Sequence, residues 1–133
     1  MKTVIITGSR HWRNAAVIRK VMAALCQEIG PFKFRHGKAK GADSYGAYIA
    51  KNVLDIQDID DYPADWDLHG NAAGPIRNRE MLDTEIAKEG KDNIIVIAFP
   101  LEDSKGTIDM IEYSRANNIE IRIFDEKGSK VDG

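Results

Sequence analysis

Two runs of apolar, largely β-branched residues constrain the fold of this chain most strongly. They are Thr3 to Thr7, T-V-I-I-T, and Asn93 to Phe99, N-I-I-V-I-A-F. Neither run has the alternation of apolar and polar residues that marks a strand exposed on one face. Strands without this alternation are typical of parallel sheets that are covered by helices on both faces. We therefore predict a layered α/β fold in which Asn93 to Phe99 is a central strand.

Helix and strand patterns alternate along the rest of the chain. Asn14 can cap a helix whose apolar residues keep helical spacing as far as Gly30-Pro31. The more polar strand from Ile56 to Tyr62 is typical of a sheet edge. This alternation predicts an α/β fold with an open parallel sheet of about five strands, right-handed crossovers and helices on both faces. The remaining predicted elements are strands at Phe32 to Arg35 and Ile119 to Phe124, and helices that begin near Asp43, at Pro75 and at Gly106-Thr107.

Length, charge and cysteine content narrow the class of protein. A chain of 133 residues has room for one core, so we predict a single domain at residues 1–124 and a polar, frayed tail at residues 125–133. The formal net charge of −2 argues against a broad surface for nucleic acid or anionic lipid. The single cysteine, Cys26, is predicted to be a buried, inert thiol in a reducing compartment. The N-terminal apolar run is too short for a signal peptide or a membrane span, so we expect a cytoplasmic protein.

Chemically distinctive residues follow four of the predicted strands at the point where each strand ends. They are Gly8-Ser9-Arg10, His36-Gly37 through Asp43, the stretch that begins at Tyr62, and Gly106-Thr107. The carboxyl ends of parallel strands meet at one edge of the sheet, and ligands of open α/β sheets bind there. The sequence therefore predicts one binding site at this edge.

The stretch from Tyr62 to Leu82 is the richest of these clusters. It is predicted to be a loop followed by a helix that starts at Pro75, since proline suits the first helical position. Arg77, Asn78 and Arg79 then fall in the first turn, where guanidinium groups and free backbone N–H groups suit a phosphate. The alternative is that the arginines form solvated pairs along the helix, Arg79 with Asp83 and Arg77 with Glu80.

The other clusters are compatible with an anionic ligand. Gly8-Ser9-Arg10 suits a phosphate or carboxylate, although the chain has neither the G-x-G-x-x-G of dinucleotide folds nor the lysine pattern of a P-loop. Gly37 and Gly41 would let the backbone pass close to a ligand. Asp43 is either a plain residue of a helix terminus or an acceptor for ribose hydroxyls or an acid–base group. Thr107 either caps its helix or leaves N–H groups free for phosphate.

Three histidines and two aspartates can be drawn as a metal site: His11, His36, His69, Asp65 and Asp67. No two of the histidines have the spacing that makes such a site specific. We therefore predict no dedicated metal site and no cofactor beyond the ligand itself, with a divalent metal alongside the ligand left open.

Aromatic residues near the predicted site have two interpretations. Trp12, Tyr62 and Trp66 either stack on a base or pack the loops down. A second aromatic and sulfur-containing set favours self-association into a homo-oligomer, or else lines the core: Tyr45, Tyr48, Met110 and Tyr113.

Five motifs together resemble one family over nearly the whole chain. They are T-G-S-R at Thr7 to Arg10, H-G-x-A-x-G-A-D at His36 to Asp43, Y-P-A-D-W at Tyr62 to Trp66, H-G-x-A-A-G-P-x-R-N-R-E-M at His69 to Met81, and G-T-x-D-M at Gly106 to Met110. On these motifs the chain resembles the SLOG superfamily, and within it the small phage and bacterial branch called YspA or YpsA-related, whose function is unknown. The resemblance implies a Rossmann-like domain that binds a nucleotide or a nucleotide-derived ligand.

Two better-known relatives imply different activities. Lonely-guy phosphoribohydrolases cleave the N-glycosidic bond of nucleoside monophosphates and carry P-G-G-x-G-T-x-x-E. Here Gly106-Thr107 match, but the glutamate position is Met110 and Asp109 comes one place early. DNA-processing protein A shares the G-S-R start and the R-N-R at Arg77 to Arg79, and it binds single-stranded DNA, a role that the acidic balance of this chain disfavours.

The resulting hypothesis is a cytosolic domain that binds a nucleoside monophosphate or an ADP-ribose-like compound, as a sensor, a sponge or a processing enzyme. Phosphate is expected on Arg10, Arg79 and the helix start at Gly106-Thr107, with ribose near Asp43. If the protein is an enzyme, the resemblance implies a phosphoribohydrolase-like hydrolase with slow or absent base release. The candidate catalytic residues are Asp43, Arg79, Glu80 and Asp109, and the candidate ligand-binding residues are Gly8, Ser9, Arg10, His36, Gly37, Gly41, Ala42, Asp43, Trp66, His69, Arg77, Asn78, Arg79, Gly106 and Thr107.

Overall fold

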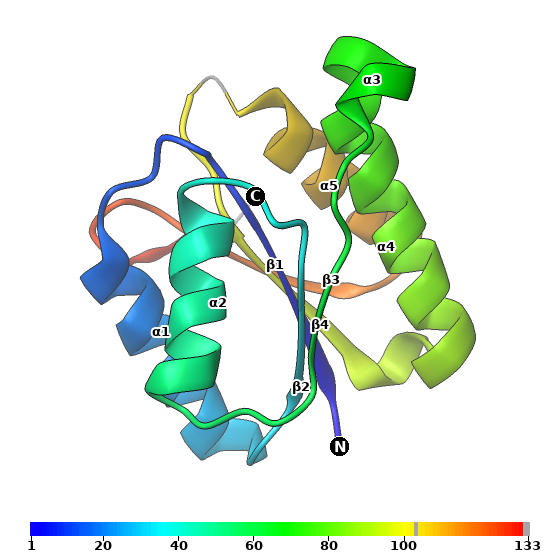
Figure 1. The fold of residues 1–133 in the computed structure, drawn as a ribbon. Coiled ribbons are helices and arrows are strands. Elements are labelled where there is room, and N and C mark those ends of the chain that lie inside the picture. Colours follow the sequence, from blue (N-terminus) through cyan, green and yellow to red (C-terminus); the bar gives the residue numbers. More distant parts are fainter. Residues whose placement is uncertain (103, 132–133) are drawn as a thin grey trace.

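One sheet of six strands forms the centre of the protein. The computed structural model describes residues 1–102 and 104–131, and the strands lie in the order β3-β2-β1-β4-β5-β6 (Figure 1). Strands β1 to β5 are parallel and β6 is antiparallel to β5, so the predicted α/β parallel sheet is confirmed. The bounds are β1 Thr3–Gly8, β2 Lys33–His36, β3 Ile59–Asp61, β4 Ile94–Phe99, β5 Glu120–Phe124 and β6 Lys130–Val131.

The two apolar runs lie side by side in the middle of this sheet. Strand β1 pairs with β4 along its whole length, from Thr3 opposite Ile94 to Gly8 opposite Phe99. Every residue of β4 is buried, as the run of apolar residues predicts for a strand covered on both faces. The order 3-2-1-4-5 reverses direction between β1 and β4, which is where open α/β sheets leave a crevice for a ligand.

Helices cover both faces of the sheet. α1 (Ala15–Ile29) and α2 (Ala42–Asn52) pack on one face, and α4 (Ala73–Glu89) and α5 (Lys105–Ala116) pack on the other (Figure 1). The first core includes Phe34 and Trp12, and the second includes Met81 and Met110. Cys26 is half-buried against the first core rather than fully buried. No helix among the described residues is both long and apolar enough to cross a bilayer.

Helix α4 begins earlier than the sequence predicts. It starts at Ala73, and the preceding stretch is not a loop but contains α3 (Trp66–His69) and a short 3₁₀ turn, η1 (Gly70–Ala72). Asp65 caps α3 by accepting a hydrogen bond from the backbone N–H of Leu68 at 3.0 Å. Pro75 is the third residue of α4, where its missing N–H still leaves no intrahelical hydrogen bond unmade.

The polar tail is more ordered than predicted. Strand β6 returns antiparallel to β5, and the Asp125 carboxylate accepts hydrogen bonds from the N–H groups of Lys127 and Ser129, both at 2.9 Å. The prediction of a frayed tail is therefore wrong for the part up to residue 131, while residues 132 and 133 lie outside the described residues.

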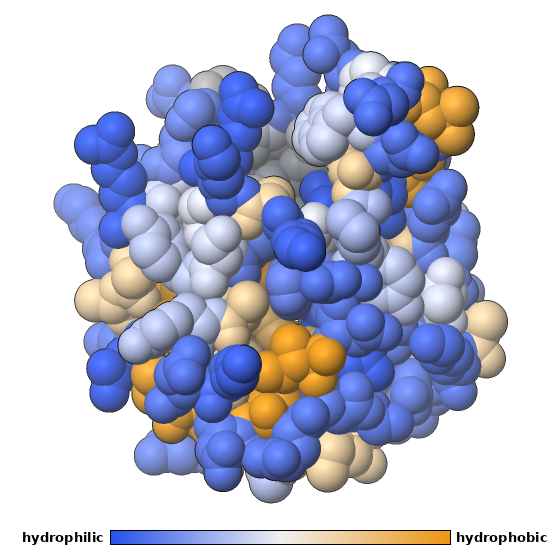
Figure 2. Space-filling view, viewed as in Figure 1, coloured by the Kyte–Doolittle hydropathy of each residue, from blue (hydrophilic) through white to orange (hydrophobic). Residues whose placement is uncertain are grey.

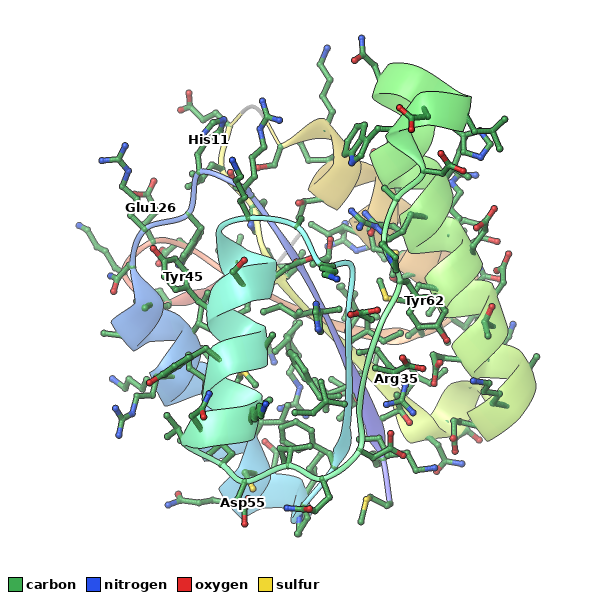
Figure 3. The ribbon with its side chains drawn as sticks, viewed as in Figure 1. His11, Arg35, Tyr45, Asp55, Tyr62 and Glu126 are labelled. Atoms are coloured by element: carbon green, nitrogen blue, oxygen red, sulfur yellow. The ribbon has the colours of Figure 1, made fainter. Side chains whose placement is uncertain are left out.

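A buried ionic network fastens α4 to the sheet edge (Figure 3). Glu85 of α4 is fully buried and accepts from Arg35 Nε of β2 at 3.2 Å and from the Tyr62 hydroxyl. Arg35 is also paired with Asp58 at 2.8 Å. Burial and the Glu85 carboxylate raise the pKa of Tyr62, so its hydroxyl stays a donor. Because this network fixes the last half of α4, it also fixes the direction in which the first half points.

The residues that suggested self-association are not all on the surface. Tyr48 is 64% exposed on α2, whereas Met110 is fully buried and Tyr45 and Tyr113 are partly buried against the two cores. Self-association therefore stays a prediction that depends chiefly on the face of α2.

Candidate functional site

A cavity of about 310 Å³ opens at the carboxyl edge of the sheet, between the ends of β1 and β4. Three of the predicted clusters converge on it, together with Asp43 of the cluster that follows β2. Figure 2 shows mainly hydrophilic residues around the top of the view, where these segments meet. We call this space the first cavity; its lining residues are Thr7, Gly8, Ser9, Arg10, His11, Ala39, Asp43, Trp66, Asn71, Gly74, Pro75, Arg77, Asn78, Ser104, Lys105, Gly106 and Thr107.

The N-terminus of α5 forms one wall of the first cavity. Ser104 occupies the cap position, but its hydroxyl accepts from the backbone N–H of Leu101 at 3.0 Å, and no described side chain caps the helix. Of the two alternatives for Thr107, the one in which it caps the helix is wrong, because Thr107 lies buried inside the first turn. The first N–H groups of a helix have no intrahelical partner, so this wall presents donors and the positive end of the helix dipole.

Arg77 lies across the cavity as a buried guanidinium, 9% exposed. Its Nε donates to Asn78 Oδ1 at 2.8 Å, and its Nη1 donates to the backbone carbonyls of Gly37 and, at 3.3 Å, Tyr62. Nη2 donates to none of the described residues and lies beside Gly74, which also lines the cavity. No carboxylate in the described part of the chain is within 4 Å of this guanidinium, and burial lowers the pKa of Arg77. The group is therefore a buried cation with a spare donor at the cavity.

Gly37 is required by Arg77 rather than by a ligand. A Cβ at position 37 would lie 2.3 Å from Arg77 Nη1 and 2.4 Å from Cζ. Gly41 has φ +73°, and a Cβ there would lie 2.4 Å from the Ser9 carbonyl oxygen. Both glycines thus let protein atoms pack closely, and Gly41 itself does not line the cavity.

Asp43 supplies the acidic group of the first cavity. It is 4% exposed, and its Oδ2 accepts from the backbone N–H of Gly37 at 3.0 Å and of Ala39 at 3.4 Å. Burial raises the pKa of this carboxyl to about 6, although the charge of Arg77 and the two N–H groups act in the opposite direction. Asp43 can therefore exchange a proton near neutral pH, which suits an acid–base group or an acceptor for sugar hydroxyls.

The three aromatic candidates for stacking on a base have different surroundings in the structure. Trp66 on α3 is 56% exposed and lines the first cavity, so its ring is available for stacking. Trp12 is buried, packs edge-on against Phe99 with ring centroids 5.3 Å apart, and donates to the Asn14 carbonyl. Tyr62 is held by Glu85. The stacking interpretation survives only for Trp66.

The structure places three of the four candidate catalytic residues outside this lining. Arg79 forms a bidentate pair with Asp109 on α5, at 2.7 and 3.0 Å, and lies over the ring of Tyr113. Glu80 is exposed and does not line the cavity either. The solvated pairs that were the alternative, Arg79 with Asp83 and Arg77 with Glu80, are also wrong, since Arg79 bonds across to α5.

Five further candidates also lie off the first cavity: His36, Gly37, Gly41, Ala42 and His69. His36 is buried against Phe34 and its Nδ1 accepts from the N–H of Lys38 at 3.0 Å, while burial lowers its pKa. Ala42 is fully buried. His69 is the last residue of α3. The candidates that the structure does bring together are Gly8, Ser9, Arg10, Asp43, Trp66, Arg77, Asn78, Gly106 and Thr107.

Sequence analysis missed eight lining residues, namely Thr7, His11, Ala39, Asn71, Gly74, Pro75, Ser104 and Lys105. His11 follows the Gly8-Ser9-Arg10 turn (Figure 3). Its backbone N–H donates to Ser9 Oγ at 3.0 Å. Its position next to that cluster was the available signal. Nowhere in residues 1–102 and 104–131 do three or more His, Cys, Asp and Glu side chains form a group that could hold a metal ion.

The fold and the cavity define the class: a Rossmann-like α/β domain with a polar cavity at the carboxyl edge of its sheet. The chain is 33% identical over 135 residues to the Gene 61 protein of Mycobacterium phage D29, and the match covers 96% of this chain and 99% of that protein. The chain belongs to the family of this phage protein. No protein-family model and no solved structure matches the chain.

Proposed function

We propose that the first cavity binds a nucleotide or a nucleotide-derived ligand, such as a nucleoside monophosphate or an ADP-ribose-like compound. The observation that carries this proposal is the buried Arg77 guanidinium, whose spare Nη2 faces the cavity opposite the uncapped N-terminus of α5. A phosphate between them would receive charge-assisted hydrogen bonds from both sides. The SLOG resemblance supports the same ligand class.

The rest of the cavity suits the other parts of a nucleotide. Asp43 offers a carboxylate oxygen to ribose hydroxyls, and Trp66 offers an exposed ring face for the base. Arg10, exposed at the cavity mouth, adds a second cation near the phosphate. In this arrangement Arg77 takes the role that the sequence assigned to Arg79.

Thermal unfolding with a panel of nucleoside monophosphates and ADP-ribose tests the proposal. A ligand at a hundred times its Kd adds roughly 2.7 kcal/mol, which for a domain of this size raises Tm by about 10 °C. Arg10→Ala should weaken binding about tenfold without altering the fold, while Arg13→Ala, an exposed arginine outside the lining, is the matched control. Arg77→Lys should abolish the shift, and Arg79→Ala should not.

Two results would contradict the proposal. The first is a wild-type protein whose Tm does not change with any member of the panel. The second is an equal loss in Arg79→Ala and Arg77→Lys, which would put the phosphate on the outer face of α4.

A phosphoribohydrolase is the second candidate, favoured by one observation: the carboxyl of Asp43 is buried against the cavity, and this burial raises its pKa to about 6. Cleaving an N-glycosidic bond needs a carboxylate beside the sugar and benefits from an acid that protonates the leaving base. Asp43 is the only carboxylate among the described lining residues, and Asp109 is engaged with Arg79. We therefore expect binding with slow or absent base release. Chromatography of free base decides the matter, since fast turnover that Asp43→Asn abolishes would establish the enzyme.

A further inference from the structure

A second cavity of about 590 Å³ adjoins the first. The two share a partition of five lining residues, which are Arg10, His11, Ala39, Trp66 and Arg77. The remaining lining residues of the second cavity come from the loops that follow β2 and β3, namely Gly37, Lys38, Lys40, Pro63 and Ala64.

The second cavity is strongly cationic. Arg10, Lys38, Lys40 and Arg77 line it, and none of its described lining residues is a carboxylate. Within the described residues neither Lys38 nor Lys40 forms an ion pair, whereas Lys33, at the start of β2, pairs with Glu89 at 2.8 Å. The chain as a whole has a net charge of −2, so this local concentration of positive charge stands out and favours the binding of an anion in the second cavity.

Lys38 and Lys40 lie on a loop that is held in place by Asp43, a residue that lines the first cavity. Asp43 accepts hydrogen bonds from the N–H groups of Gly37 and Ala39, the residues that alternate with Lys38 and Lys40. The N–H of Lys38 donates to His36 Nδ1. The ammonium groups are therefore carried by a fixed backbone beside the site proposed for ribose.

Arg77 stands at the boundary between the cavities. Its Nη1 bonds to the carbonyl of Gly37, which lines the second cavity, while Nη2 lies beside Gly74, which lines the first. The carbonyls of Gly37 and Tyr62 occupy Nη1, so Nη2 is the nitrogen that can donate to a ligand, while the positive charge of the guanidinium acts on anions in both cavities.

From this geometry we infer that the ligand carries two linked phosphoryl groups, one in each cavity, so that it is a nucleoside diphosphate or a diphosphate-linked derivative. The inference rests on the proposed nucleotide site and narrows its ligand class. The first phosphoryl group lies between Arg77 and the α5 N-terminus. The second lies between Arg77, Lys38 and Lys40.

Isothermal titration calorimetry with AMP and ADP, repeated with GMP and GDP, tests the inference. The wild type should bind the diphosphate about tenfold more tightly than the monophosphate, since the added group gains charge-assisted hydrogen bonds. The double variant Lys38→Ala/Lys40→Ala should lose this preference and keep its affinity for the monophosphate. The control Lys20→Ala/Lys51→Ala removes the same charge from exposed lysines outside both cavities and should keep the preference.

Several outcomes would overturn the inference. Equal affinity for mono- and diphosphate would do so while leaving the proposed function intact, and so would a Lys38→Ala/Lys40→Ala variant that keeps the wild-type preference. Displacement of ADP by an oligodeoxythymidylate that binds more tightly would assign the cations to a nucleic-acid strand instead. If no mononucleotide binds, the proposed function fails together with the inference.

Discussion

Replacing Asp43 with asparagine is expected to stabilise the protein at neutral pH. The side chain is 4% exposed, and burial raises its pKa from the ordinary 3.8 to about 6. The folded state therefore holds the proton more tightly than the unfolded state does. Stability contributed by this group is fully present below pH 3.8, falls as the pH rises towards 6 and stays low above it. Each factor of ten in proton affinity is about 1.4 kcal/mol, so the ionised carboxylate lowers stability by roughly 3 kcal/mol at pH 8.

Urea unfolding of wild type and Asp43→Asn from pH 4 to pH 8 measures this effect. The two proteins should have nearly equal free energies of unfolding at pH 4, and the variant should become more stable as the pH rises, by up to roughly 3 kcal/mol. The variant should also bind nucleotide more weakly at pH 7, because a neutral amide is a poorer acceptor for a ribose hydroxyl. Asp67→Asn, at an exposed position on α3, is the control and should show no such trend. A variant that is less stable than wild type at pH 8, or a difference that does not change with pH, would refute the reasoning.

Three further predictions concern the framework around the site. Gly37→Ala would place its Cβ against the Arg77 guanidinium, so it should lower stability by about 1–3 kcal/mol and abolish nucleotide binding, whereas Gly74→Ala, with 3.7 Å of clearance, should fold normally; calorimetry and urea unfolding check both. Glu85→Ala should cost about 3 kcal/mol because it removes the buried one of the two carboxylates that pair with Arg35 and leaves the Tyr62 hydroxyl without its acceptor, and adding Arg35→Met should recover part of that loss; a single variant within about 1 kcal/mol of wild type would contradict this. Self-association predicts a mass above that of the monomer in light scattering at high concentration, and a monomer at every concentration would be the contrary result.

The strands of this protein could be predicted because their sequence signal is local. Uninterrupted apolar runs predicted that β1 is buried on both faces and that β4 is a central strand, and the polar run from Ile56 to Tyr62 predicted the edge strand β3. The convergence of clusters on one edge followed from the parallel arrangement alone. Helix α3 was missed because it is a single turn with no buried residue, so it leaves no apolar periodicity to detect.

The sequence did not show which of Arg77 and Arg79 faces the cavity, because this depends on how α4 packs against the sheet. The buried stripe of this helix contains Arg77, Asn78, Met81, Leu82 and Glu85, which recur at helical spacing. Met81 and Leu82 stand four residues after Arg77 and Asn78, so the sequence held a signal that these two polar residues face inward. The expectation that buried residues are apolar hides this signal, because the charged residues Arg77 and Glu85 stand on either side of Met81 and Leu82.

The two buried arginines in the described part of the chain have different partners: Arg35 pairs with carboxylates of the protein, and Arg77 does not. Arg35, 5% exposed, is matched by Glu85 and Asp58, and such a pair holds an element in place without leaving donors for a ligand. Arg77 donates to two backbone carbonyls and one side-chain amide oxygen, and burial lowers its pKa. The carboxyl whose charge acts on Arg77 is Asp43, and burial raises the pKa of that carboxyl to about 6. The Arg77 guanidinium and the Asp43 carboxylate would both be more stable with a bound partner. The same holds for the free backbone N–H groups at the uncapped N-terminus of α5. The proposed nucleotide is an anion with hydroxyl groups and would offer a partner to all three, so their position at one edge of the sheet supports the proposal.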